Sequence, residues 1–185
     1  MSASFPVAGP IDSVLAESSE YLVRSLHEFR VRLKAFMTPG KGKAAAVPVK
    51  PTHATIWVAK SCPAWQTAIL KTLRGYVVDG KITADNKQIL EDVRSNEEVV
   101  KFIKKAMSFV QAVRLKFDVD GAKALQSELS FDEAATLLAN QEYLKSTLEL
   151  EEFDVRWSSE STDAKLIDEL CPGEPRIMFS KRDAL

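Results

Sequence analysis

A heptad repeat of large apolar residues between Asp12 and Met37 constrains the fold of this chain more than any other feature. Such residues recur there every seven positions in two interleaved registers. They are Leu15, Leu22, Phe29 and Phe36, with Leu26 and Leu33 between them. The spacing predicts one long amphipathic helix, with the Asp12 side chain accepting from the free amides of the first turn. One helix cannot bury two registers alone, so its partner is either a later part of this chain or something outside it.

Charge is distributed unevenly along the sequence. The whole chain carries 25 bases and 26 acids, yet the fifty-residue window from Phe29 to Val78 holds no acid and nine bases. The window is therefore +9 and the remainder −10, within a total of −1. The nine bases are Arg30, Arg32, Lys34, Lys41, Lys43, Lys50, Lys60, Lys71 and Arg74. Such separation favours attraction of a polyanion to one face; the alternative is a solvated loop whose lysines keep it extended.

The remaining patterns predict an α+β fold, mostly α with a small β-sheet. A length of 185 residues with 45% hydrophobic content allows one domain, or one and a half. We expect residues 1–37 to form the end of a helical bundle and residues 38–52, rich in Pro, Gly and Lys, to form a flexible basic linker. Residues 53–185 are expected to form a small α+β module that is incomplete at its end.

Local signals predict the elements of this module. The β-branched run Ala54–Ala59 is typical of a short buried strand, residues 153–157 alternate with a period of two, and residues 177–179 form a last strand. A helix begins at Pro63 and carries the apolar stripe Trp65, Ile69, Leu73 and Tyr76, and Asp79-Gly80 ends it. Shorter helices are expected at residues 85–93 and 162–170.

Two capping-box sequences predict two further helices. Ser95-Asn-Glu-Glu98 precedes a helix whose core-facing residues are Val99, Ile103, Val110 and Phe117. Ser130-Phe-Asp-Glu133 precedes a helix over residues 134–148. Because both boxes stand directly before apolar runs, they are fairly specific start signals.

No catalytic, metal-binding or membrane-spanning pattern occurs in the sequence. His27 and His53 are isolated from each other, and Gly40-Lys-Gly-Lys43 resembles a phosphate loop but has the wrong spacing and no following helix. Cys62 and Cys171 are expected to be reduced thiols in a cytoplasmic protein. No apolar stretch approaches the ~20 residues that cross a bilayer. We expect no metal and no cofactor in this chain.

Several short strings carry a resemblance to a known family. They are Phe5-Pro-Val-Ala-Gly-Pro10, Ile56-Trp-Val-Ala-Lys60, Pro63-Ala-Trp-Gln66 and the stretch from Leu148-Glu-Leu-Glu151 to Cys171-Pro-Gly173. In this order they resemble the C-terminal region of the eukaryotic cytosolic leucyl-tRNA synthetases, from Phe5 to about Phe179. Trp57 stands where the family has tyrosine in a Tyr-Val-Ala-Lys motif. The resemblance implies the end of the helical anticodon-binding domain followed by the start of the C-terminal extension.

The resemblance also implies what the chain binds. The family joins leucine to tRNA with ATP, but its His-x-Gly-His and Lys-Met-Ser-Lys-Ser signatures are absent here. The chain alone is therefore expected to be inactive in aminoacylation and editing, with leucine tRNA as a partner held through its backbone. Candidate RNA contacts, chosen by charge alone, are Arg30, Arg32, Lys34, Lys41, Lys43, Lys60, Lys71 and Arg74. Trp57 and Trp65 either stack on an unpaired base or pack in the core.

A second hypothesis is a non-catalytic relative that acts as a protein-interaction module in a synthetase assembly. Its partners would be other synthetases or the catalytic remainder of the enzyme. A third is a degenerate product without function, against which the heptad pattern and the capping boxes argue. The sequence leaves open whether the chain is a stand-alone protein or a fragment.

Overall fold

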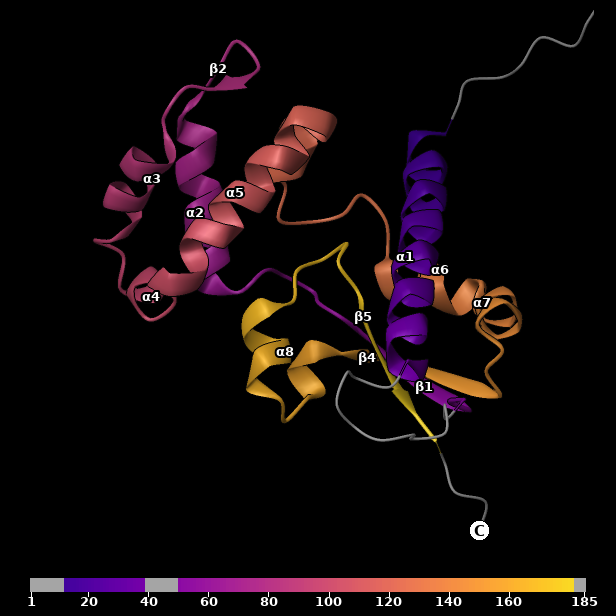
Figure 1. Ribbon diagram of the computed structural model, residues 1–185. Helices are drawn as coiled ribbons and strands as arrows, with labels where there is room; N and C mark the ends of the chain where they lie inside the picture. The colour runs from indigo at the N-terminus through magenta and orange to yellow at the C-terminus, as the bar shows by residue number, and fades with distance from the viewer. Residues whose placement is uncertain (1–11, 39–49, 182–185) are drawn as a thin grey trace, which may run out of the picture. The chain divides into compact units, whose positions relative to one another are not determined.

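The computed structural model of the chain describes residues 12–38 and 50–181 (Figure 1). The helices are α1 Ser13–Met37, α2 Ala64–Gly75, α3 Asn86–Val93, α4 Glu97–Val100, α5 Ile103–Asp120, α6 Glu133–Ala139, α7 Gln141–Leu148 and α8 Ala164–Glu169. The strands are β1 His53–Val58, β2 Val77–Val78, β3 Lys81–Ile82, β4 Glu152–Trp157 and β5 Arg176–Ser180, and the 3-10 helices are η1 Gly121–Leu125 and η2 Ser158–Glu160. This combination confirms the predicted α+β fold.

The chain divides into two compact units. Among the described residues, unit 1 combines 12–38, 50–54, 130–153 and 179–181, and therefore contains α1, α6 and α7. Unit 2 combines Thr55–Leu129 and Asp154–Met178, and contains α2 to α5 together with α8. Each unit draws on segments that are far apart in the sequence, so each is held together by long-range contacts.

In unit 1, α1 packs against the short helices α6 and α7. The partner that the heptad pattern requires is therefore supplied by a later part of this chain. The buried residues of α1 lie in its middle and are Tyr21, Ser25, Leu26 and Phe29. Near its C-terminal end the Phe36 ring lies 5.8 Å from the ring of Phe179 but stays partly exposed. The full two-register stripe predicted from the sequence is wrong at its ends, because Leu15 is 64% exposed and Phe36 is 45% exposed. Two short partner helices cannot cover a 25-residue helix along its whole length.

A buried polar pair joins α1 to the start of α6. The Tyr21 hydroxyl donates to Glu133 Oε1 over 2.7 Å, and the Tyr21 ring lies 5.2 Å from the ring of Phe131. Burial, and then the neighbouring Glu133 carboxylate, raise the pKa of the Tyr21 phenol above its ordinary value. The phenol therefore keeps its proton and donates to one oxygen of a carboxylate that is itself buried.

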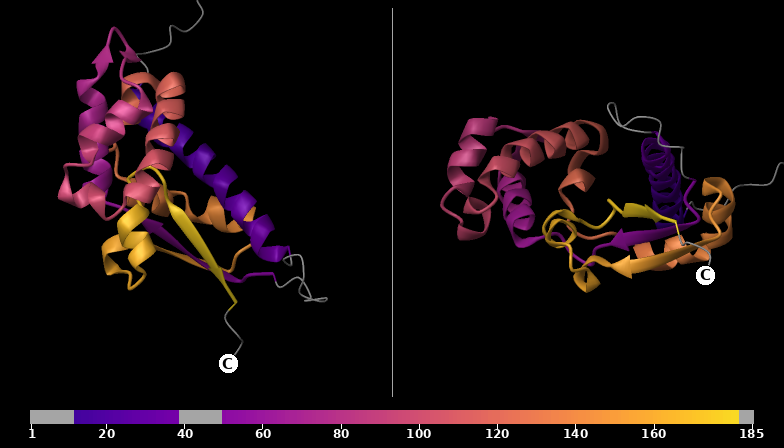
Figure 2. Two further views of the ribbon diagram at one scale, coloured as in Figure 1. Left: turned by 60° about the vertical axis from the view of Figure 1, so that its left-hand side comes forward. Right: turned by 60° about the horizontal axis from the view of Figure 1, so that its bottom comes forward.

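The three longer strands form one sheet in the order β4-β1-β5. The Thr52 carbonyl, just before β1, accepts from the amides of Glu151 and Glu152 at the start of β4, so these two strands run in parallel. The Thr52 amide donates to the Ser180 carbonyl at the end of β5, so β5 runs antiparallel to β1. Figure 2 shows the arrows of β1 and β4 pointing one way and that of β5 the other. The predicted strands are thereby confirmed.

In unit 2, α2 is the central helix and packs against α3, α4 and α5. Its Trp65 ring lies 5.3 Å from the rings of both Phe102 and Phe109. Ile69 and Leu73 continue the same face and are fully buried. This face confirms the apolar stripe predicted after Pro63, except that Tyr76 lies beyond the last residue of α2. The helices predicted at residues 85–93 and 162–170 are also present, as α3 and α8.

The predicted role of Asp79-Gly80 as a helix end is wrong. α2 ends at Gly75, and the two residues instead form the turn between β2 and β3, where Val77 pairs with Ile82 and Val78 with Lys81. Both turn residues have positive φ, +47° at Asp79 and +72° at Gly80. Asp-Gly is a preferred pair for such two-residue hairpin turns, since both positions require that left-handed backbone.

Helices begin at both predicted capping boxes, but the side chains that cap them are not those of the serines. The caps are Asn96, which accepts from the Glu98 amide over 3.0 Å, and Asp132, which accepts from the Ala135 amide over 2.9 Å. Short carboxylate and amide side chains reach the first-turn amides as well as serine does. Both predicted helices are also broken, the first between α4 and α5 and the second at Asn140. At the first break, Phe102 turns its ring onto Trp65.

The expectation of two reduced thiols is also wrong for this structure. Cys62, just before α2, and Cys171, just after α8, form a disulfide across 109 residues of sequence. Two further contacts tie the same ends together: the Trp65 indole donates to the Asp168 carbonyl over 2.7 Å, and the Gln66 amide donates to the Glu169 carbonyl over 3.1 Å. The segment after α8 therefore lies beside the start of α2, a proximity that the spacing of the two cysteines in the sequence cannot reveal.

Candidate interaction surfaces

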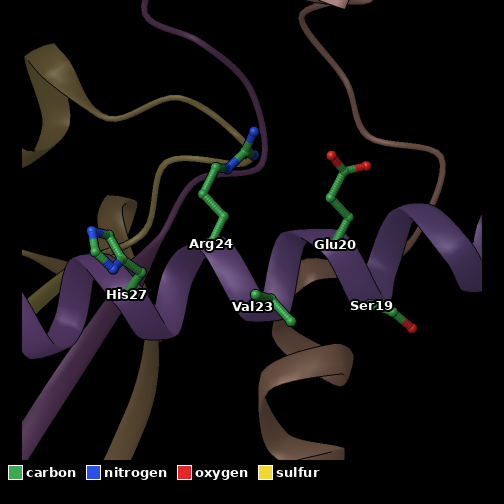
Figure 3. Close-up of a pocket in the computed structure, with 5 residues that line it drawn as sticks. All are labelled: Ser19, Glu20, Val23, Arg24 and His27. Atoms are coloured by element: carbon green, nitrogen blue, oxygen red, sulfur yellow. The ribbon is translucent and has the colours of Figure 1, made fainter.

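One candidate surface is the outer face of α1, opposite the residues that pack on α6 and α7. Figure 3 shows Arg24 and Glu20 extending from the same side of the helix, with His27 one turn further along. With Ser19 and Val23 they line a shallow hollow of about 600 Å³. Because acid, base and imidazole alternate there, the hollow offers mixed charge and no nucleophile held by a base. His27 is exposed.

The candidate RNA contacts on α1 lie on two sides of the helix. Arg30 and Lys34 are exposed one turn apart, beside the exposed Val31, and they continue the face that carries Arg24 and His27. Arg32 is exposed nearer to the packed side. Among the described residues, Arg30, Arg32 and Lys34 have no ion-pair partner. The candidates Lys41 and Lys43, and most of the predicted linker, lie outside the described residues.

The other candidates lie in unit 2, where two of them already have partners. Lys60 follows β1, and its ammonium lies 4.9 Å from the Trp157 ring centroid, within cation–π range. The Arg74 guanidinium donates to the Leu125 carbonyl, with 2.9 Å from Nε, and so ties α2 to η1. Lys71 is exposed on α2. The ninth base of the window, Lys50, is paired with Glu149 within unit 1.

The positions of Trp57 and Trp65 favour packing within the protein over stacking on an unpaired base. Trp65 is buried and has both its ring and its indole N–H engaged, as described above. Trp57 is half-buried on β1, and its indole nitrogen is buried without a hydrogen-bond partner among the described residues. The Trp65 ring therefore presents no open face comparable to that of a base-stacking platform.

A second candidate surface is the outer face of α5, which the sequence did not single out. The face of α5 toward the core consists of Ala106, Val110, Val113 and Phe117. On other sides of the same helix, Met107 is 37% exposed, Leu115 69% and Val119 84%. Leu115 and Val119, one turn apart, form the most exposed apolar pair on this helix, and exposed apolar patches on a helix are characteristic of docking sites.

Charges stand at both ends of this face. Lys104, in the first turn of α5, and Asp118, in the last turn, are exposed and make no ion pair among the described residues. Neighbouring Lys105 differs, because its ammonium lies 2.6 Å from Glu169 on α8. That hydrogen bond holds the pKa of the Glu169 carboxyl below its ordinary value, against the opposing effect of burial and with help from Arg176.

The described ranges, 12–38 and 50–181, contain neither a metal-binding cluster nor a membrane-spanning helix. No group of three or more His, Cys, Asp or Glu side chains is placed to hold a metal ion. No helix in these ranges has the length and apolar character needed to span a bilayer.

Comparison with known proteins adds two findings. A family described as "Leucine--tRNA ligase, RagD-binding domain" matches residues 58–130, the stretch that forms α2 to α5 and η1 in unit 2. The chain is 42% identical over 182 residues to the cytoplasmic leucine–tRNA ligase of Pongo abelii, which covers 97% of this chain and 15% of that protein. The chain is homologous to a segment of the cytoplasmic leucine–tRNA ligases.

Other relatives agree with this identification. The Dictyostelium discoideum enzyme is 37% identical over 183 residues, covering 97% of this chain and 17% of that protein. The Neurospora crassa enzyme is 33% identical over 152 residues, covering 72% of this chain and 13% of that protein. The segment therefore spans less than a fifth of these ligases. The predicted family is confirmed, and the relatives' names agree with the predicted cytoplasmic location.

Proposed function

We propose that this ligase segment is a protein-docking module, and that the helices of unit 2 bind RagD. The observation that carries the proposal is the coincidence of residues 58–130, matched by the RagD-binding family, with one helical core formed by α2 to α5 and η1. A packed core holds surface side chains in fixed positions, which a binding site requires. This proposal follows the alternative reading of the sequence, a protein-interaction module.

The surface of the matched stretch supports the proposal. It exposes Val78 on the hairpin, Val100 on α4, and Met107, Leu115 and Val119 on α5. Burying such side chains against a partner contributes roughly 25 cal/mol per Å² of apolar surface removed from water. Aminoacylation, which the relatives' names describe, is proposed only for a whole ligase, because this sequence has neither catalytic signature.

We expect the full 185-residue chain to bind purified RagD in a saturable manner with one site per chain, as measured by isothermal titration calorimetry. The heat capacity change of binding should be negative, because apolar surface is buried. A titration with an unrelated protein of similar size and charge serves as the control. The titration should extend to about 100 µM RagD, since a Kd of ~10⁻⁴ M corresponds to a binding free energy of about −5.5 kcal/mol. Absence of binding over this range would contradict the proposal.

A second candidate function is contact with the backbone of leucine tRNA. It is favoured by Arg30 and Lys34, which stand exposed one turn apart, without ion-pair partners among the described residues, inside the acid-free window. Cations in this arrangement bind phosphates without reading bases. Arg32, Lys41, Lys43, Lys60, Lys71 and Arg74 remain candidate contacts of the same kind, although Lys60 and Arg74 would have to leave their present partners.

Reversal of two charges tests this second function. We expect Arg30→Glu with Lys34→Glu to weaken binding of leucine tRNA and to reduce the slope of log Kobs against log salt by roughly 2, one for each lost phosphate contact. Lys165→Glu, an exposed change on α8 outside the acid-free window, is the matched control. An unchanged affinity and slope in the double variant would show that this face of α1 does not touch the RNA.

A further inference from the structure

We propose that the outer face of α5 is the surface that RagD contacts, and that it receives an amphipathic helix of that partner. The partner helix would carry a carboxylate at one end of its apolar stripe and a cation at the other. This inference rests on the proposed function and adds the position of the surface and the chemistry of the segment that it accepts.

The first argument is the geometry of α5. Met107, Leu115 and Val119 are separated by eight and four residues, so they fall within one broad face of an α-helix with 3.6 residues per turn. Residues opposite this face, such as Val110 and Phe117, fill the core of unit 2. The helix is therefore anchored on one side and exposes three large apolar side chains on the other, with the exposed polar residues Ser108 and Gln111 between Met107 and Leu115. From Met107 to Val119 this face runs for about 18 Å at 1.5 Å per residue, and its apolar residues are concentrated at Leu115 and Val119, one turn apart.

The second argument is the placement of charge. Lys104 and Asp118 lie on the same outer face, separated by about 21 Å along the axis at 1.5 Å per residue. Within α5 this order is unfavourable, because cations are destabilising near a helix N-terminus and anions near a C-terminus. Asp120 adds a further acid to the last turn, and no acid stands in the first. The charges therefore do not stabilise α5 itself, whereas a partner with the opposite order would satisfy both ends.

The ion pairs of other charged residues on α5 support the assignment of Lys104 and Asp118 to the partner surface. Lys105 and Lys116 are paired with Glu169 and Glu174. Lys104 and Asp118, which flank the stripe, are unpaired among the described residues. Two lysines of α5 are thus neutralised within unit 2, whereas Lys104 and Asp118 remain available for a partner.

The experiment compares variants of the full chain in titrations with RagD. Leu115→Glu and Val119→Glu should each weaken binding by ~30-fold or more, because a carboxylate would replace an apolar contact at the centre of the interface. The milder Leu115→Ala, which keeps a helix-favouring residue, should weaken it by about tenfold. Leu138→Glu on α6, an exposed leucine of unit 1, is the matched control and should leave the affinity unchanged. Circular dichroism checks that each variant is folded.

Charge reversal tests the predicted chemistry of the partner. Lys104→Glu and Asp118→Lys should each reduce the affinity by roughly fivefold at low salt, and the reduction should shrink at high salt, as expected for rim charges. Lys87→Glu on α3 is the control for a change of charge alone.

The outcomes separate the inference from the function on which it rests. If the wild-type chain binds RagD and the Leu115 and Val119 variants bind equally well, the position of the surface is wrong while the proposed function stands. If the wild-type chain does not bind RagD, both the proposed function and the proposed position of the surface are wrong. If the variants instead abolish self-association of the chain, seen by light scattering, the stripe belongs to a dimer and the inference is overturned.

Discussion

Removal of the Cys62–Cys171 disulfide should lower the free energy of unfolding of unit 2 by roughly 2–5 kcal/mol. The bond closes a loop across 109 residues, so breaking it frees a large part of the chain in the unfolded state. It also joins the start of α2 to the segment after α8, where the Trp65 indole and the Gln66 amide bond to carbonyls of α8. Without the covalent link the junction depends on these two hydrogen bonds and on the ion pairs that Lys105 and Lys116 make with Glu169 and Glu174.

Tryptophan fluorescence during denaturant unfolding is the suitable measurement, because Trp57, Trp65 and Trp157 all belong to unit 2. The oxidised chain, the reduced chain and the Cys62→Ser, Cys171→Ser double variant should be compared. The reduced chain and the double variant should share the lower midpoint, and a reductant should leave the double variant unchanged. Equal midpoints for the oxidised and reduced chains would contradict the expected effect.

Phe29→Ala should destabilise unit 1 by about 3–5 kcal/mol, because a large aromatic side chain is lost from the core. Phe29 is fully buried at the centre of the α1 contact with α6 and α7. Leu15→Ala is the matched control, since Leu15 belongs to the same heptad register but is exposed. It should change stability by less than about 0.5 kcal/mol, as surface changes usually do.

Both variants can be followed by the hydrogen-exchange rates of the amides in the middle of α1. In Phe29→Ala these amides should lose protection, whereas in Leu15→Ala only the first turns should change. Similar losses in the two variants would mean that α1 is buried along both ends of its heptad stripe, as the sequence alone suggests.

Local signals in the sequence were sufficient to predict most elements. Asp12 caps α1 as expected, Pro63 precedes α2, and the alternation at residues 153–157 appears as β4. These features depend on neighbouring residues, so one sequence contains the information needed. The failures depend on distant residues. The heptad pattern could not show that the buried residues of α1 lie only in its middle. The spacing of Cys62 and Cys171 could not show that the segment after α8 lies beside the start of α2.

The candidate surfaces show the same limit. The acid-free window identified Arg30 and Lys34 as candidate RNA contacts, and both are exposed. It could not show that Arg74 is bonded to Leu125 or that Lys60 lies over Trp157. The α5 stripe was missed because Leu115 and Val119 lie among the apolar residues of a core-forming helix. Periodicity identifies Val110 and Phe117 as core residues, but only the packed structure shows which other apolar residues are left exposed.

Hydrogen–deuterium exchange of the full chain with and without saturating RagD tests the central claim most directly. We predict slower exchange at the amides of residues 103–120, which form α5, with the amides of α1 unchanged. Protection confined to α1, α6 and α7 would place the binding surface in unit 1 and contradict the account. An exchange pattern identical with and without RagD would contradict the proposed docking function itself.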